Sequence, residues 1–96
     1  MPLYLTLAKY TEEGRKSIDQ APAKYKDFVN LVESKEGKLI GAYGLMGEWD
    51  IATITEFPDD KTAMTVVMTL GKAGRIATQT MNAIHMEDFV TLAKNV

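Results

Sequence analysis

The centre of the chain reads KLIGAYGL at residues 38–45, MGEW at 46–49 and DIATITEF at 50–57. Two runs rich in apolar and β-branched residues flank a short break that contains Gly47, a pattern typical of two antiparallel strands joined by a tight connection. The only tryptophan of the chain, Trp49, lies in this break beside Asp50. We therefore predict a β-hairpin over Lys38–Phe57, around which the other elements are arranged.

Before the hairpin, the sequence predicts one strand and one long helix. Residues 2–10 alternate between two sets of side chains, as a strand does. Thr11 and the acidic residues after it predict a short helical turn over 11–17. A longer helix begins near Pro22, carries an apolar stripe at helical spacing, and is expected to end at Gly37.

After the hairpin, Pro58 and the two aspartates that follow it predict the end of a strand and the cap of a helix. That helix is expected over residues 60–72, because apolar side chains recur there at intervals of three and four. A fourth strand is expected over 75–84, followed by a final short helix over 86–94.

This order of elements predicts the fold class. A β-α-β-β-α-β chain with a terminal helix is the ferredoxin-like α+β plan, built on a four-stranded antiparallel sheet. Right-handed crossovers place both main helices on one face of that sheet. A length of 96 residues is expected to form a single domain over residues 1–96.

The alternation in the first strand assigns its side chains to two faces of the sheet. We expect the row formed by Leu3, Leu5 and Leu7 to face the helices. The other face would then be uncovered, with hydroxyl and aromatic groups and little charge. Its expected members are Tyr4, Thr6, Thr53, Thr55, Thr78 and Thr80. Such a face suits a half-polar interface or a lined cavity, so we predict a homodimer or higher homo-oligomer formed through the sheet face.

Composition argues against several functional classes. The 11 basic and 13 acidic residues are interspersed without a basic run, so we expect no nucleic-acid binding. Cysteine is absent and there is one histidine, which argues against disulfides, thiolate chemistry and a metal site. No stretch approaches the ~20 apolar residues of a membrane span. The Met-Pro start lacks a basic leader, so we expect no membrane association and a cytoplasmic location.

Two residues are candidates for catalysis. Asp50 beside Trp49 is a carboxylate that the indole could partly desolvate, and a raised pKa would suit proton transfer. The alternative is that Asp50 accepts backbone N–H groups and holds the turn. His85 has the only side chain that ordinarily titrates near neutral pH, so it is a candidate general base. Its place just before the last helix equally fits a cap or linker residue.

Other residues are candidates for binding a small molecule. Tyrosines with polar tips and threonine hydroxyls on an apolar wall are typical of ligand pockets. Tyrosines at strand ends are also common at interfaces, so this alternative stays open. The predicted ligand-binding residues are Tyr4, Thr6, Tyr43, Trp49 and Thr53.

The sequence resembles the GYD domain family of small prokaryotic proteins. The likeness is carried by Met46-Gly47-Glu48-Trp49-Asp50, where the family usually has Gly, any residue, Tyr and Asp. Further matching segments are 51–54, 56–60, 78–83 and 87–89. The resemblance implies a ferredoxin-like, dimeric α/β-barrel fold and no particular reaction. Trp49 replaces the family tyrosine and removes its hydroxyl, which puts any acid, base or donor role of that aromatic residue in doubt.

Three function classes follow. The favoured one is a homodimeric α/β-barrel protein that binds a small ligand or serves a structural role. The alternative is a cofactor-free enzyme, monooxygenase-like or isomerase-like, with its site in the barrel, and it rests on fold analogy. The third is a module that binds a partner protein. The sequence identifies no cofactor.

Overall fold

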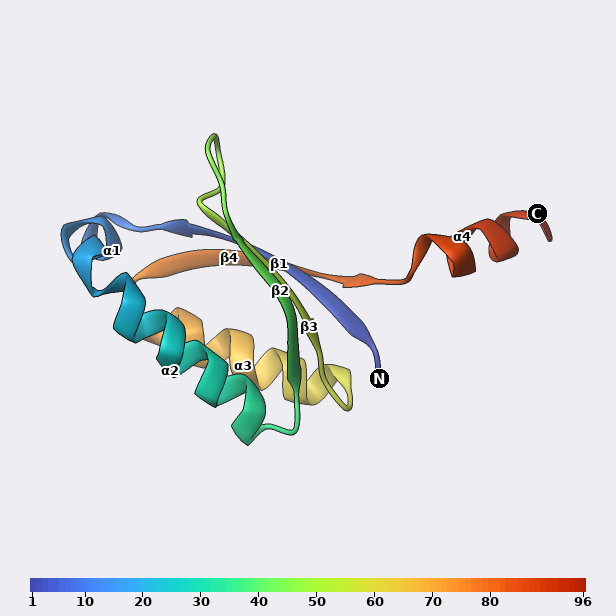
Figure 1. The fold of residues 1–96 in the computed structure, drawn as a ribbon, viewed down its shortest axis with the longest axis horizontal. Helices are drawn as coiled ribbons and strands as arrows, with labels where there is room; N and C mark the ends of the chain where they lie inside the picture. Colours follow the sequence, from blue (N-terminus) through green and yellow to red (C-terminus); the bar gives the residue numbers. More distant parts are fainter.

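Four antiparallel strands form one sheet in the order β2-β3-β1-β4 in the computed structural model, which describes residues 1–96 (Figure 1). The two main helices lie on one face of this sheet. The elements are β1 (Leu3–Tyr10), α1 (Glu12–Lys16), the 3-10 turn η1 (Ile18–Gln20), α2 (Ala21–Ser34), β2 (Lys38–Gly44), β3 (Ile51–Glu56), α3 (Asp60–Lys72), β4 (Ile76–Ala83) and α4 (Met86–Ala93). The predicted ferredoxin-like α+β fold is confirmed, including the central hairpin of β2 and β3.

The central strand of the fold is β1, which pairs with β3 on one side and with β4 on the other. Its register runs from Leu3 opposite Glu56 to Ala8 opposite Ile51 on the β3 side. β2 and β4 are the edge strands, and the buried sheet residues Tyr4, Ala8, Thr53 and Thr55 all come from the two inner strands.

Local capping signals set the helix boundaries. The hydroxyl of Thr11 accepts the Gly14 N–H at 3.2 Å and caps α1. The carboxylate of Asp59 accepts the Thr62 N–H at 2.8 Å and caps α3. Pro22 lies in the first turn of α2, where no backbone donor is needed. These short-range interactions explain why the sequence predicts the starts of the helices closely.

The end of α2 differs from the prediction. Glu36, and not Gly37, adopts the left-handed conformation, with φ of 60°. The Gly37 N–H donates to the Val32 carbonyl at 2.9 Å, and a Cβ at Gly37 would overlap the Phe57 ring. Gly37 is therefore required for close packing, while the backbone turn is made by a residue that adopts this conformation at a cost.

The prediction of which sheet face the helices cover is wrong. The helices lie over the face that carries Tyr4 and the β3 threonines, and Tyr4, Thr53 and Thr55 are buried. The row of Leu3, Leu5 and Leu7 lies on the opposite face, which no element of the chain covers. We call these the covered face and the bare face.

The error has a physical reason. Both rows of β1 are largely apolar, so a period of two residues cannot choose between them. The choice is made by packing: the rings of Tyr4 and Phe57 lie 5.9 Å apart and join Val32, Ala63 and Val66 in the core. On the bare face, the leucines lie opposite residues that are themselves mostly apolar. Leu5 pairs with Ile54 and Met81, and Leu7 with Ala52 and Gln79.

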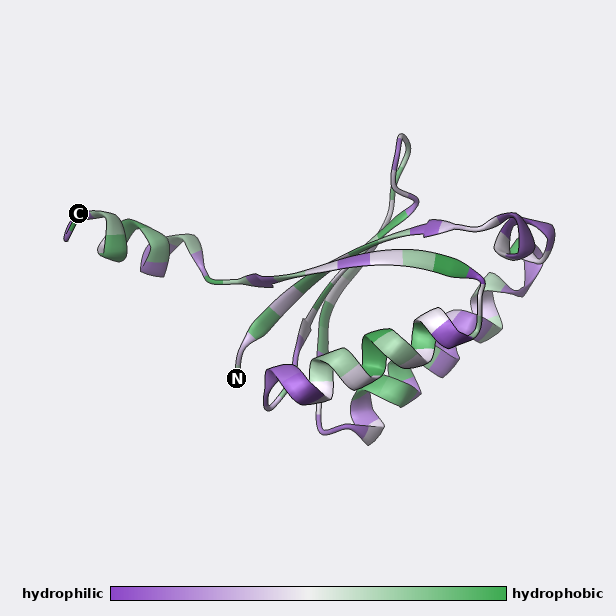
Figure 2. Ribbon diagram, turned by 180° about the vertical axis from the view of Figure 1, so that it is seen from behind, coloured by the Kyte–Doolittle hydropathy of each residue, from purple (hydrophilic) through white to green (hydrophobic).

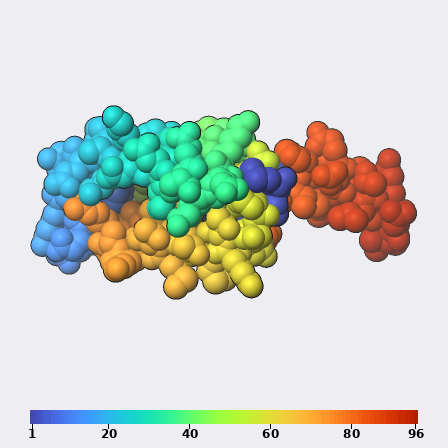
Figure 3. Space-filling view, turned by 90° about the horizontal axis from the view of Figure 1, so that it is seen from below, coloured from blue at the N-terminus to red at the C-terminus, as the bar shows by residue number.

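The C-terminal segment stands apart from the rest of the molecule. Beyond β4 the chain extends outward, and α4 lies at the far end of the long axis (Figures 1 and 3). The radius of gyration is 14.5 Å. A compact chain of this length would have a value of about 12.5 Å. The difference reflects a helix that packs against no other part of its own chain.

Candidate functional site

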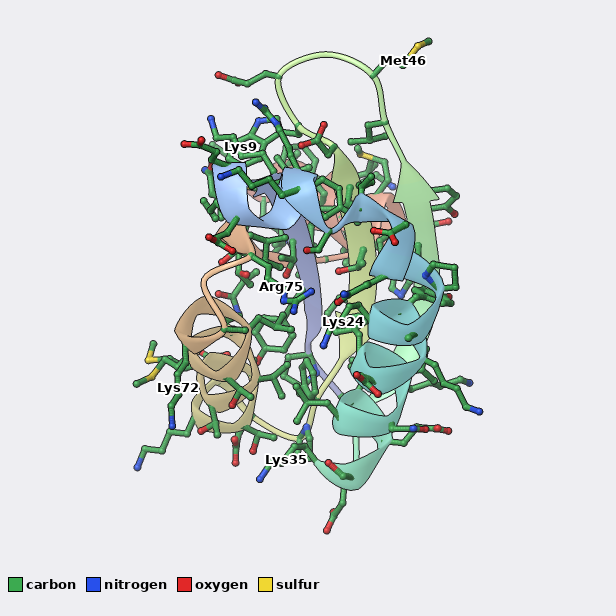
Figure 4. All side chains as sticks on the ribbon, turned by 90° about the vertical axis from the view of Figure 1, so that its left-hand side faces the viewer. Lys9, Lys24, Lys35, Met46, Lys72 and Arg75 are labelled. Atoms are coloured by element: carbon green, nitrogen blue, oxygen red, sulfur yellow. The ribbon has the colours of Figure 1, made fainter.

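A cavity of about 530 Å³ lies between the covered face and the helices. Figure 4 looks through the opening between α2 and α3. Cavities of roughly 300–1,000 Å³ are typical of sites for small molecules. The helices pack closely on the sheet only at one end, where Tyr4, Val32, Phe57, Ala63 and Val66 form the core. We call this the closed end, and the cavity extends from it toward the other end of the helices.

The sheet supplies a floor that mixes hydroxyl and apolar groups. Tyr4, Thr6, Ala8 and Tyr10 of β1 reach the cavity because alternate strand residues project to the same side. The Thr6 and Thr80 hydroxyls hydrogen-bond each other at 2.9 Å. The floor therefore carries polar atoms at fixed positions, which is a requirement for orienting a ligand.

The helices supply mostly apolar walls. Tyr25, Phe28 and Leu31 come from α2, and Val67 and Leu70 from α3. Their spacing of three or four residues puts them on one side of each helix. Hydrophobic residues are concentrated on the middle turns of α3 (Figure 2). The stripes that the sequence assigns to a core thus line a space that the chain does not fill.

Two cations, Arg75 and Lys24, also line the cavity. The Arg75 guanidinium, just before β4, donates from Nη1 to the Gln20 side-chain carbonyl at 2.9 Å and to the Ser17 hydroxyl at 3.2 Å. Lys16 and Glu12 form the only ion pair of the chain within 4.0 Å, so neither cation is paired with a carboxylate. Asp27 is the one acidic residue of the lining.

A polar cluster fastens the closed end. The Tyr4 hydroxyl donates to Oδ1 of Asp60 at 2.5 Å, and the Asn82 amide donates to the same oxygen at 3.2 Å. Burial and, second, this bond to the carboxylate raise the pKa of Tyr4 to about 12. The bond from Tyr4 and then that from Asn82 lower the pKa of Asp60. The Tyr4 hydroxyl therefore stays protonated and serves as a structural donor.

The structure brings three of the predicted ligand-binding residues together, since Tyr4, Thr6 and Thr53 all line the cavity. Tyr43 lies at its edge, but its side chain is 57% exposed and its ring lies beside Gly41. Trp49 does not line the cavity. Its ring lies under the Lys9 ammonium, with 4.8 Å from Nζ to the ring centroid. Binding by these residues remains a prediction.

Asp50 uses its polar groups to join the hairpin to β1. Its Oδ2 accepts the Tyr10 N–H at 2.9 Å, and its own N–H donates to the Ala8 carbonyl at 2.9 Å. Its carbonyl accepts the Leu45 N–H at 2.8 Å and closes the turn. These bonds favour the structural interpretation of Asp50.

His85 lies at the other end of the sheet. It precedes α4, is exposed, and makes no side-chain capping bond. Asp50 lies near Ala8, whereas Ala83, two residues before His85, pairs with Leu3. Because β1 separates these positions, the structure does not bring the two catalytic candidates together. Neither lines the cavity, and their catalytic roles stay untested predictions.

Sequence reasoning missed most of the lining, including Lys24, Tyr25, Phe28 and Arg75. Tyr25 and Phe28 carry a usable signal, because an aromatic pair at helical spacing lies on one side of the helix, although the structure leaves Tyr25 52% exposed. Lys24 and Arg75 carry none, because they resemble ordinary surface charges until the fold places them at the same opening. No group of three or more His, Asp or Glu side chains is placed to hold a metal ion. None of the helices has the length and hydropathy needed to cross a bilayer.

The order of elements and the sheet topology define a class of fold, that of the ferredoxin-like α+β proteins. Two solved structures of this type share the fold. FFRP-DM1 gives a TM-score of 0.62 at 20% identity, covering 88% of this chain and all of that one. The 5-chloro-2-hydroxyhydroquinone dehydrochlorinase TftG of Burkholderia phenoliruptrix, in complex with 2,5-dihydroxybenzoquinone, gives 0.63 at 18% identity, covering 86% of this chain and 94% of that one.

The chain belongs to the GYD domain family, which matches residues 4–93. It is also similar to a protein of Thermus thermophilus named "Glutamine synthetase and cystathionine beta-lyase binding protein". The two are 24% identical over 95 residues, which cover 98% of this chain and all of the relative. The resemblance noted from the hairpin turn is thus confirmed over nearly the whole chain.

Proposed function

We propose that this chain is a homodimeric small-molecule-binding protein whose ligand occupies the cavity between the sheet and the helices. The observation that carries the proposal is the unfilled cavity itself. Only 9 of 96 residues are buried, so the chain has little core to spare. A ligand that binds there adds contacts with the lining side chains and stabilises the folded chain.

The test is a thermal-shift screen with small aromatic compounds, neutral and acidic. At a ligand concentration of about 100 times Kd, binding adds about 2.7 kcal/mol to stability, which raises Tm by several degrees in a domain of this size. Val67→Trp should abolish the shift by filling the cavity from α3. Met68→Trp is the matched control, because Met68 is exposed and does not line the cavity. Equal shifts in both variants, or none in the wild type, would contradict the proposal.

The dimer is supported by the bare face. No element of the chain covers its aliphatic side chains, and sheets that pack face to face lie about 10 Å apart. One self-complementary patch used twice is the commonest route to a dimer. The similar solved structures belong to a fold type that is dimeric.

Light scattering tests the dimer directly. The wild type should have at least twice the 10.6 kDa mass of one chain. Leu5→Glu should give the monomer mass, because it places a charge at the centre of the bare face. Ala23→Glu on the exposed surface of α2 should leave the mass unchanged. A wild-type monomer at micromolar concentration would overturn this part of the proposal.

The alternative of a cofactor-free enzyme is supported by the neighbour named as a dehydrochlorinase. A reaction in this cavity would have to use the hydroxyls and cations that line it, since Asp50 and His85 lie outside. The alternative of a protein-binding module is supported by the name of the Thermus thermophilus relative. Turnover of a bound compound favours the first alternative, and co-purification of a partner enzyme without any ligand shift favours the second.

A further inference from the structure

We infer that the cavity takes an organic carboxylate with an apolar, ring-sized body, held by its charged end at Arg75 and Lys24. This inference rests on the proposed small-molecule function and specifies the class of ligand. It begins from the uneven distribution of polarity along the cavity. The wall residues Phe28, Leu31, Val67 and Leu70 offer an apolar compartment, whereas both cations are found at the opening.

Arg75 is held ready for an anion. Its two hydrogen bonds go to neutral acceptors, Ser17 and Gln20, so its charge is not compensated by either. A guanidinium has five N–H donors in a planar fork that matches a carboxylate, and Nη1 alone makes both of these bonds. The remaining donors are free to bind a ligand.

Lys24 adds a second positive charge from α2. Figure 4 shows Lys24 and Arg75 in the same opening between α2 and α3. Asp27 lies one turn further along α2 and is the only acid of the lining, but neither cation forms an ion pair with it. The chain as a whole has a net charge of −2, so this local excess of positive charge is against the trend of the molecule.

The ligand class follows from the apolar compartment and the positively charged opening taken together. An apolar ring gains free energy in proportion to the apolar area that it removes from water. A charge-assisted bond to a carboxylate adds more than a bond to a neutral amide of the same shape. A ring-bearing carboxylate uses both regions, whereas a purely apolar ligand leaves the cations unpaired and a small inorganic anion leaves the apolar walls unfilled.

Titration calorimetry with matched pairs tests the inference. The probes are benzoate, 2-naphthoate and 4-phenylbutyrate, each compared with its primary amide. In the wild type, at least one carboxylate should bind tenfold or more tightly than its amide, with an advantage that falls as salt rises. Arg75→Gln and Lys24→Gln should reduce that advantage and leave amide binding unchanged. Arg15→Gln is the control, since Arg15 does not line the cavity.

Each outcome decides between the inference and the function on which it rests. If amides and carboxylates bind equally, the carboxylate inference is overturned and the small-molecule function stands. If no member of any pair binds, both fail. Arg75→Lys guards against misfolding, because it keeps the charge without the planar fork and should retain part of the advantage.

A different observation concerns the C-terminal arm, residues 84–96. Its apolar side chains are exposed, and Phe89 is 58% exposed. Met86, Phe89, Val90 and Ala93 follow helical spacing and form one stripe. An isolated helix shorter than about 12 residues is not stable in water, and α4 has 8. The helix therefore needs a surface that its own chain does not provide (Figure 3).

We propose that this surface belongs to a second copy of the chain. The arm leaves β4, the edge strand next to β1, beyond the end of the sheet. The same chain also presents the bare face, so it has two apolar surfaces without partners. A second copy stacked on the bare face extends past that edge, and a two-fold axis lets each arm pack on the other copy. Both surfaces are then covered by one symmetric assembly.

Hydrogen exchange and sedimentation test this second proposal. Amides of residues 86–93 should be protected in the wild-type dimer and exposed in the Leu5→Glu monomer. Phe89→Glu should weaken dimerisation tenfold or more, while Thr91→Glu, which adds the same charge to another side of α4, should not. Protection that persists in the monomer would place the arm on its own chain and overturn the proposal. An unchanged dimer with Phe89→Glu would also overturn it, with the sheet-face dimer left standing.

Discussion

The two faces of the sheet differ in residue type and in whether the helices cover them, and the residue types alone do not indicate which face is covered. The covered face carries tyrosines and threonines, and a cavity separates much of it from the helices above. The bare face carries aliphatic residues such as Leu5 and Ile54, which pair directly with each other and have nothing above them. The more core-like face is the one on the outside of the chain. Apolar character alone therefore does not tell which face of a sheet the helices of the same chain will cover.

The largest expected change in unfolding free energy comes from a mutation on the covered face. The two faces should also differ in whether the cost of a mutation depends on protein concentration. Phe57→Ala removes a ring from the buried core of the covered face and should cost about 3–5 kcal/mol of unfolding free energy. Leu5→Ala should cost less in the monomer, and with the proposed dimer its cost should grow with protein concentration, because that dimer would bury the bare face. Urea unfolding at several concentrations measures both. If the loss of unfolding free energy in Leu5→Ala is the same at all protein concentrations, the expected difference between the two faces is wrong.

Alkaline pH should lower the unfolding free energy, because it ionises Tyr4 on the covered face. Its pKa is about 12 in the folded chain against 10.0 for the free group, so the folded state holds a proton that the unfolded chain releases first. Stability is therefore complete below pH 10 and falls by roughly 2–3 kcal/mol as pH rises to 12. Tyr4→Phe keeps the ring and should flatten this part of the profile. Unfolding free energies of both proteins between pH 9 and 12 provide the measurement, and identical slopes would refute the role given to Tyr4.

Gly37→Ala should lower stability, because it displaces the Phe57 ring on the covered face although Gly37 itself lies outside the sheet. The added Cβ would lie 2.6 Å from ring carbons of Phe57, and forcing that ring to move should cost about 1–3 kcal/mol. Gly44→Ala is the control, since a Cβ there meets nothing within 4 Å. Thermal unfolding distinguishes the two, and equal Tm values would mean that the Phe57 ring adapts without cost.

The smallest expected change in stability comes from a residue on neither face of the sheet. It serves as a reference that does not depend on ligand or on protein concentration. Glu36→Gly should raise stability by about 0.5–1 kcal/mol, because glycine adopts the left-handed conformation without the strain of a side chain. The gain should be the same at all protein concentrations and with or without a ligand. A loss of stability in chemical denaturation would show that the Glu36 side chain makes a favourable interaction that outweighs its backbone cost.

The sequence is sufficient for the elements and their order because the signals are local. Thr11, Pro22 and Asp59 act within three residues of their own positions. The choice of face is not local, since it depends on which row meets the helix stripes. The sequence groups Tyr4, Thr6 and Thr53 because they project from the same face of the sheet, whatever lies above that face. Arg75 was not, because its partners Ser17 and Gln20 are more than 50 residues away in the chain.

The polar cluster at Asp60 makes the contact between helices and sheet stronger at one end of the molecule than at the other. One carboxylate oxygen ties Tyr4 of β1 and Asn82 of β4 to the first turn of α3, next to the aromatic core. At the opposite end, the layers are joined mainly by the bonds of Arg75 and by the hydroxyl of Thr11 on the Gly74 carbonyl. Local opening needs the least free energy where the contacts are fewest. Of the two ends of the helix layer, we therefore expect the one at Arg75 to separate from the sheet at the lower cost in free energy.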